Sequence, residues 1–262
     1  MFGGTHHLGA GLLTGAGGGL LAGLFGVGGG LVMVPLLALI LRLDQHRAQG
    51  ATLAAMLLPT GLPAVLQYRR RGVAWHWPLV GVLVLGFLAG VTLGSLAANG
   101  IPSEALRLGF AGLLLFLAFK TFRRQEPAFV DREQDPLRIS VGLWSRGLPI
   151  GMAGGILSGL TGLGGAVVVI PLLASRFRMS QHEAQLATLM MMLPPIGLPG
   201  VLIYARAQGG LPWDIIVGVA LGFAGGAFLG ARVATRLPGA RLKQIYAVVM
   251  VLMALLVLAR TR

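Results

Sequence analysis

The sequence predicts an all-α membrane protein, a polytopic helical bundle of two inverted-topology repeats, each with a glycine-broken first segment plus three spanning helices. Composition is the first observation behind this prediction: of 262 residues, 55% are hydrophobic, 11% are charged and 42 are Gly. Soluble domains carry roughly a quarter charged residues and about 7% Gly. Because the chain also lacks Cys, these proportions exclude a water-soluble globule, a disordered chain and a disulfide-rich secreted domain.

The spacing of the apolar runs is the second observation. A helix needs about 20 apolar residues to cross a bilayer. Four runs precede a polar stretch and four follow it: 8–41, 48–68, 77–98 and 106–122, then 139–177, 184–204, 213–234 and 242–259. We therefore expect an N-terminal repeat at 1–122, a cytoplasmic linker at 123–138 and a C-terminal repeat at 139–262.

An internal duplication is the third observation. When the chain is shifted by 136 residues without a gap, about 38 of the 84 positions from 23 to 106 are identical with those from 159 to 242. Pro35 then aligns with Pro171, and Gln49 with Gln185. This self-similarity indicates that the two halves arose by duplication.

The basic residues indicate how the halves lie in the membrane. The net charge is +13, and the Lys and Arg residues fall in short loops between apolar runs, where they set topology rather than bind nucleic acid. If every segment crossed, the halves would be parallel and the basic residues would divide about 12 to 9. If each first segment enters and returns, the halves are inverted and the division is about 15 to 6. The steeper asymmetry favours inversion, with the linker cytoplasmic and both termini outside.

The first segment carries the main irregularity. It is too long for one comfortable crossing and contains a cluster of glycines, each of which costs about 1 kcal/mol in a helix relative to Ala. We therefore predict two half-length helices that meet near Val27, with Pro35 just inside the second. The equivalent break lies at 162–165 and is followed by Pro171. The clustered glycines of the first segment are Gly15, Gly17, Gly18, Gly19, Gly23, Gly26, Gly28, Gly29 and Gly30.

Two glycine-rich openings, 26–30 (GVGGG) and 162–166 (GLGGA), each precede a Pro and a Gln-containing turn. Together with the duplication, these motifs resemble the sulfite exporter TauE/SafE family of bacterial membrane transporters over essentially the whole chain. The resemblance implies transport of a small sulfur-containing anion such as sulfite, sulfoacetate or a related organosulfonate, and it does not fix which one. It also implies a multi-pass protein of the bacterial inner membrane. Because the basic residues place both termini outside, the termini would then be periplasmic.

Paired interruptions in equivalent segments are the best sequence pointer to a binding site in repeat-built transporters. The glycine breaks form one such pair, and Pro/Gly clusters within the second segments form the other. Half-helix N-termini at these interruptions present N–H groups and partial positive charge to an anion. The alternative interpretation is that the glycines serve helix packing and the prolines only kink the helices.

Polar side chains near the breaks are few. Gln49 and Thr52 share one helical face, as do Gln185 and Thr188, and each offers neutral donors that could bind an oxyanion or join helices. With the interruptions they complete the substrate-binding candidates: Gly26, Gly28, Gly29, Gly30, Gln49, Thr52, Pro59, Gly61, Pro63, Gly162, Gly164, Gly165, Gln185, Thr188, Pro195, Gly197 and Pro199.

His46 and His182 are candidates for carrying a coupling proton, since His titrates near neutral pH; capping of the following segment is their alternative role. Aromatic residues flank the spans and are typical of interfacial anchors: Tyr68, Tyr204, Trp77 and Trp213. All eight carboxylates fall in turns or in the linker, so a buried carboxylate proton relay is not expected.

We therefore expect a secondary transporter that works by alternating access, with no enzymatic activity, metal or cofactor. The alternatives are a permease subunit of a multi-component transporter and a carrier of another small organic anion. The expected partners are the anionic substrate and the lipid bilayer. A coupling proton or sodium ion and a further copy of the chain are also compatible with the sequence, whereas nucleic acid is not expected.

Overall fold

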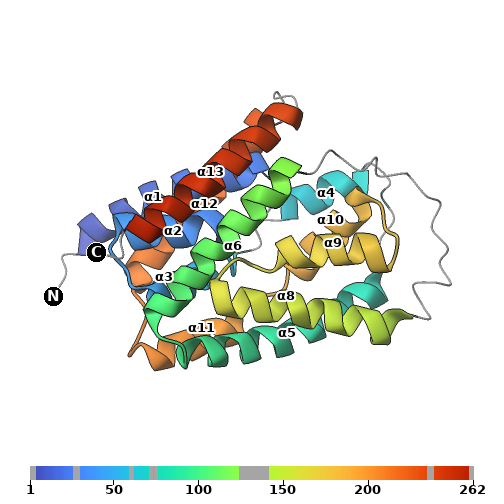
Figure 1. Ribbon diagram of the computed structural model, residues 1–262, viewed down its shortest axis with the longest axis horizontal. Helices are drawn as coiled ribbons and strands as arrows, with labels where there is room; N and C mark the ends of the chain where they lie inside the picture. The colour runs from blue at the N-terminus through green and yellow to red at the C-terminus, as the bar shows by residue number, and fades with distance from the viewer. Residues whose placement is uncertain are drawn as a thin grey trace.

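The computed structural model describes residues 4–25, 30–58, 62–70, 73, 76–123, 142–234 and 239–259. All regular structure within these ranges is helical (Figure 1). The all-α class predicted from the composition is therefore confirmed.

The elements of the two halves correspond in order, and most of them also in length. The N-terminal half contains α1 (Gly4–Phe25), α2 (Gly30–Ile40), α3 (Gln45–Ala55), α4 (Leu62–Arg70), α5 (Trp77–Asn99) and α6 (Ser103–Arg123). The C-terminal half contains the π-helical turn η1 (Leu143–Gly147), α8 (Leu148–Thr161), α9 (Ala166–Arg176), α10 (Gln181–Met191), α11 (Leu198–Ala207), α12 (Trp213–Ala234) and α13 (Gly239–Ala259). The bounds of α2, α3 and α6 recur in α9, α10 and α13 with 136 residues added, which is the offset of the sequence repeat. The expected linker lies outside the described residues apart from Arg123, the last residue of α6.

The halves are joined by two long helix pairs, and each pair takes one helix from each half. In the first pair, a Cβ atom on Gly222 of α12 would collide with the Leu12 carbonyl of α1, and one on Gly230 with the Leu20 carbonyl. The second contact lies eight residues further along each helix than the first, so α1 and α12 run in the same direction. Glycine is needed here because only its lack of a side chain lets the two backbones approach so closely.

The second pair, α5 with α8, repeats this arrangement. A Cβ atom on Gly86 would collide with the Leu148 carbonyl, and one on Gly94 with the Ile156 carbonyl. These contacts again advance by eight residues on each helix, so α5 and α8 also run in the same direction. Gly86 and Gly94, which lie outside the glycine breaks, thus serve helix packing, whereas Gly81 has no atom within 4 Å of its Cβ position and does not take part.

The prediction of two half-length helices in the first segment is wrong for the first of them. α1 is continuous over 22 residues and includes Gly15, Gly19 and Gly23, whereas α2 has 11 residues. The helical cost of these glycines is offset by packing, because Gly15 and Gly19 bring α1 against the backbone of α12. The sequence pattern cannot separate a glycine that breaks a helix from one that packs it.

Each first segment is a helical hairpin with a long first arm and a short second arm. Gly18 of α1 lies beside the Met33 side chain of α2, and the equivalent Gly154 of α8 lies beside Val169 of α9. Thus α2 folds back along α1, and α9 folds back along α8.

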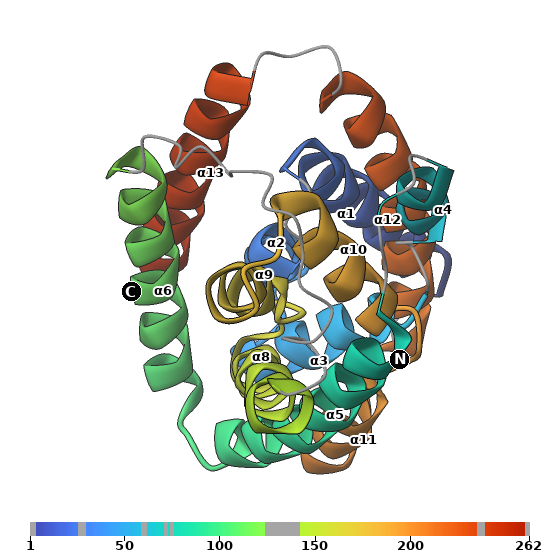
Figure 2. The same cartoon turned by 90° about the vertical axis from the view of Figure 1, so that its right-hand side faces the viewer.

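Equivalent helices of the two halves point in opposite directions along the long axis of the molecule (Figure 1). By the colour sequence, α1 runs from left to right and α8 from right to left, while α6 runs to the right and α13 returns to the left. Figure 2 shows α6 and α13 side by side at one edge of the bundle. Opposite directions of equivalent helices are what an inverted repeat requires.

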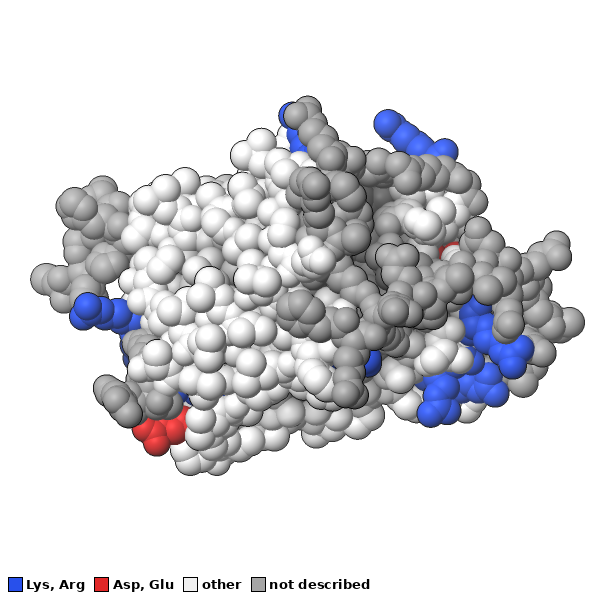
Figure 3. Space-filling view, turned by 45° about the horizontal axis from the view of Figure 1, so that its top comes forward, with Lys and Arg blue, Asp and Glu red and all other residues white. Residues whose placement is uncertain are grey.

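Two helices in the described part of the chain are long and apolar enough to cross a bilayer, Trp77–Asn99 and Trp213–Gly230. They match the spans predicted at 77–98 and 213–234. The predicted second segments, in contrast, are each divided, into α3 with α4 and into α10 with α11. On the face shown in Figure 3, a broad area without charged residues has Lys and Arg at its margins, as expected for a surface in contact with lipid.

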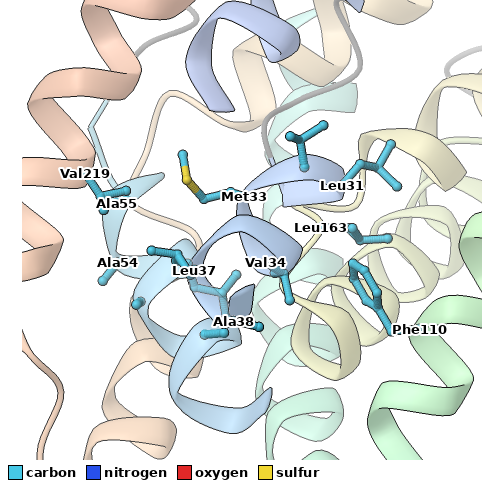
Figure 4. Close-up of a cluster of buried hydrophobic side chains, with 14 of the residues drawn as sticks. Leu31, Met33, Val34, Leu37, Ala38, Ala54, Ala55, Phe110, Leu163 and Val219 are labelled. Atoms are coloured by element: carbon cyan, nitrogen blue, oxygen red, sulfur yellow. The ribbon is translucent and has the colours of Figure 1, made fainter. Parts of the chain in front are cut away.

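The largest core cluster joins the two halves around α2. Leu31, Val34 and Leu37 of α2 are buried together with Leu163, which lies between α8 and α9, and with Phe110 of α6 (Figure 4). The core therefore surrounds the interruption between α8 and α9, the region in which the sequence predicts the site.

Candidate functional site

The second glycine break, residues 162–165, separates α8 from α9 as predicted. Gly162, Gly164 and Gly165 have φ angles of 76°, 79° and 73°, a left-handed conformation that side chains with a Cβ atom disfavour. Gly165 also needs to be glycine for space, because its Cβ atom would lie 2.6 Å from the Gly154 carbonyl oxygen. Backbone of this kind at membrane depth is tolerated where protein covers it or where it lines a cavity.

This break leaves backbone donors at the start of α9. The N–H groups of Val168 and Val169 both donate to the Gly165 carbonyl, at 3.0 and 3.1 Å. The N–H groups of Gly164, Gly165 and Val167 have no hydrogen-bond acceptor within the described part of the chain. Together with the partial positive charge of a helix N-terminus, these donors are suited to a small anion.

Substrate-binding candidates from both halves of the chain lie close together at the second glycine break. Gly30, the first residue of α2, lies against the Gly162 carbonyl, and its Cβ atom would lie 2.5 Å from Cα of Leu163. A Cβ atom on Gly162 would in turn lie 3.1 Å from Cα of Gln49. The remaining first-break candidates, Gly26, Gly28 and Gly29, lie outside the described residues.

Gln49 is fully buried, and both ends of its side-chain amide are hydrogen-bonded. Its Nε2 donates to the Leu160 carbonyl at 2.9 Å, and its Oε1 accepts from the Tyr204 hydroxyl at 2.8 Å. The Tyr204 hydroxyl also lies 2.7 Å from the Gly159 carbonyl. The last carbonyls of a helix have no partner within the helix, so these side chains cap the C-terminal end of α8.

Gln185 makes the equivalent contact with the other half. Its Oε1 accepts from the Tyr68 hydroxyl of α4 at 2.7 Å, but the side chain is only half-buried. Its amide hydrogens have no acceptor within the described residues. The two Gln candidates are thus related by sequence but differ in environment.

Thr52 and Thr188 are buried, one helical turn after Gln49 and Gln185. Each hydroxyl donates to the carbonyl four residues earlier, Thr52 to Ala48 and Thr188 to Ala184, both at 2.7 Å. Their protons are therefore used within their own helices, which leaves the oxygens as acceptors only.

The histidines also differ between the halves. His46 is buried; its Nε2 donates to the Ala98 carbonyl at 3.0 Å, and its Nδ1 lies 2.7 Å from the Ser103 hydroxyl. His182 is exposed, with its ring centroid 6.0 Å from that of Tyr68. His46 therefore joins α3 to the end of α5 and the start of α6, the contact role considered as its alternative.

The proline clusters interrupt the second segments rather than kink them. α10 ends at Met191 and α11 begins at Leu198, so Pro195 and Gly197 lie in the connection, and Pro199 lies in the first turn of α11. Pro is well accommodated there because the first helical N–H groups have no partner in the helix. In the N-terminal half, Pro63 belongs to α4, and Pro59 and Gly61 lie outside the described residues.

Two features of the site were missed in the sequence. Tyr204, predicted to anchor the protein at the membrane interface, is instead fully buried. A Cβ atom on Gly164 would lie 2.9 Å from Cε of Met56 and 3.0 Å from Cε of Met192. The repeat aligns these Met residues, as it aligns Tyr68 with Tyr204. That alignment was the one feature of the sequence that could have marked these residues as part of the site. Trp77 and Trp213 are exposed at the starts of α5 and α12.

A helical bundle of two related halves, joined around an interrupted segment whose N–H donors lack acceptors among the described residues, has the architecture of a membrane transporter. The family model described as Sulfite exporter TauE/SafE matches residues 11–257. The chain belongs to this family, and it is a membrane transporter.

Relatives of this chain are likewise named as probable membrane transporter proteins. A Bacillus subtilis protein named "Probable membrane transporter protein YdhB" is 28% identical over 227 residues, which cover 86% of this chain and 89% of the relative. A "Probable membrane transporter protein" of Haemophilus influenzae is 28% identical over 264 residues, covering 93% and 95%. A Methanocaldococcus jannaschii protein named "Probable membrane transporter protein MJ0441" is 25% identical over 198 residues, covering 72% and 69%.

Proposed function

We propose that this protein is a secondary transporter of a small sulfur-containing oxyanion, such as sulfite or an organosulfonate, in a bacterial inner membrane. The observation that carries the proposal is the set of N–H groups at Gly164, Gly165 and Val167, which have no acceptor within the described residues. The family description supports a sulfur oxyanion as the class of substrate.

The chemistry of the second glycine break favours an anion over a cation or a neutral solute. Its donors are neutral backbone groups, so they bind an oxyanion without the desolvation cost of a buried Lys or Arg. They stand at the N-terminus of an 11-residue helix, whose dipole favours negative charge there.

Alternating access is supported by the relation between the halves. In Figure 1, α1 begins and α13 ends toward one end of the molecule, while α6 ends and η1 begins toward the other. We therefore propose that both termini are periplasmic and the linker is cytoplasmic. Rocking of one half against the other would then expose the break to the two sides in turn.

Flux through the purified protein tests this function. Proteoliposomes that contain only this protein should release trapped sulfite without ATP, because a secondary transporter needs no ATPase partner. The same assay with and without a pH gradient measures coupling to protons. Flux that depends strictly on a soluble ATPase would contradict the proposal and would favour a permease subunit.

A matched pair of glycine variants tests whether sulfite flux depends on the second glycine break. Gly164→Val should abolish sulfite flux without preventing membrane insertion, because Val disfavours the φ angle of 79°. Gly81→Val is the control, since Gly81 has no atom within 4 Å of its Cβ position. Undiminished flux in Gly164→Val would contradict a binding role for this break.

A further inference from the structure

The duplicated Tyr–Gln contacts connect the two halves reciprocally. Tyr204 of the C-terminal half donates to Gln49 of the N-terminal half, and Tyr68 of the N-terminal half donates to Gln185 of the C-terminal half. Both partners are related by the 136-residue offset. Substitutions at one Tyr–Gln contact can therefore be compared with the equivalent substitutions at the other.

The Gln49 contact serves the scaffold. Both ends of its amide are bonded, and its Nε2 covers the Leu160 carbonyl at the end of α8. The single proton of the Tyr204 hydroxyl is shared between the Gln49 Oε1 and Gly159 carbonyl oxygens, at 2.8 and 2.7 Å. Unpaired carbonyls at membrane depth are costly because no water is available to bond them. This contact therefore stabilises the end of α8 from which the second glycine break begins.

The Gln185 contact leaves a donor free. Tyr68 uses the Gln185 Oε1 atom, so the end of the amide that remains available carries only N–H groups. The side chain is half-buried, and these hydrogens have no acceptor within the described part of the chain. The Nε2 atom is not among the buried side-chain atoms that lack a partner, so the amide is open to water or to a ligand that accepts hydrogen bonds.

We infer that the duplicated motif has divided its roles: Gln185 donates its amide hydrogens to the transported anion, Tyr68 positions that amide, and Gln49 with Tyr204 maintains the scaffold. This inference rests on the function proposed above and adds which half supplies the side-chain donor. An anion suits this amide because its N–H end has no acceptor within the described residues, while its Oε1 already accepts from the Tyr68 hydroxyl.

The equivalent Gln variants test the division directly. Gln185→Leu and Gln49→Leu are reconstituted separately, and the concentration dependence of sulfite flux is measured together with the unfolding temperature in detergent. For Gln185→Leu we expect KM to rise about tenfold or more, the effect of losing a hydrogen bond to a charged group, with an unchanged unfolding temperature. For Gln49→Leu we expect a lower unfolding temperature and a KM within about twofold of the wild type, because its amide bonds protein rather than anion.

Further variants separate positioning from folding. Tyr68→Phe should raise KM by about threefold, because the amide is less well oriented after loss of one hydrogen bond, while the maximal rate and the unfolding temperature stay unchanged. Tyr204→Phe should instead lower the unfolding temperature. Gln185→Glu should raise KM more than Gln185→Leu does, because a carboxylate repels the anion.

The outcomes distinguish this inference from the proposed function. Absence of sulfite flux in the wild-type protein would overturn both. Wild-type flux with an unchanged KM in Gln185→Leu would overturn the inference alone. Equal KM increases in Gln185→Leu and Gln49→Leu would also overturn it, because the two halves would then contribute alike.

Discussion

At the scale of single residues, position in the repeat does not determine environment. His46 and His182 are equivalent in sequence, but His46 is 8% exposed with both ring nitrogens in hydrogen-bond contact, whereas His182 is exposed. A residue that carries a proton during transport must release it in each cycle. We therefore assign His46 to the scaffold and keep His182 as the candidate for proton coupling.

This assignment predicts unequal effects of two Ala substitutions. His46→Ala should lower the free energy of unfolding by about 2 kcal/mol, because it removes two buried hydrogen bonds worth about 1 kcal/mol each. His182→Ala, an exposed site, should change it by less than about 0.5 kcal/mol. Denaturant unfolding in detergent measures both, and equal losses would contradict the assignment.

At the scale of elements, glycine has two roles that the structure separates. In the second break, left-handed φ angles require it, while in α1, α5, α8 and α12 it lets paired backbones approach. Helix contacts of this kind depend on small residues because lipid gives apolar side chains little reason to associate. The glycine content of 42 residues therefore reflects both packing and the break.

Two neighbouring glycines of α12 test the packing role. Gly222→Ala should lower the free energy of unfolding by about 1–3 kcal/mol, the usual cost of overpacking, because the new methyl group would meet the Leu12 carbonyl of α1. Gly225→Ala is the matched control, since its Cβ position has no atom within 4 Å, and it should be neutral or slightly stabilising. Thermal unfolding in detergent gives the comparison; a stable Gly222→Ala variant would contradict the close α1–α12 contact.

The sequence predicts some elements closely because their signal is local. The apolar run at 77–98 corresponds to α5, and the break at 162–165 lies where α8 ends and α9 begins. The continuity of α1 could not be predicted, because its glycines are tolerated only through contact with α12. Tyr204 was placed wrongly at the interface for a similar reason: alignment relates it to Tyr68, but nothing local indicates that each of the two contacts the other half.

At the scale of the whole molecule, the two halves are arranged in opposite directions. Equivalent helices point in opposite directions (Figure 1), and helices from different halves pair as α1 with α12 and α5 with α8. A carrier built this way can exchange the roles of its halves while the site stays between them. We therefore expect equivalent positions to face opposite sides of the membrane.

Arg42 and Arg178 allow the most direct test of this claim. They are equivalent and exposed, with φ angles of 54° and 56°, so substitution strains both alike. The chain has no Cys, so Arg42→Cys and Arg178→Cys each introduce a single thiol. With a membrane-impermeant maleimide, we expect labelling of Arg42→Cys from the periplasmic side and of Arg178→Cys only after the inner membrane is permeabilised. Labelling of both variants from the same side would contradict this expectation.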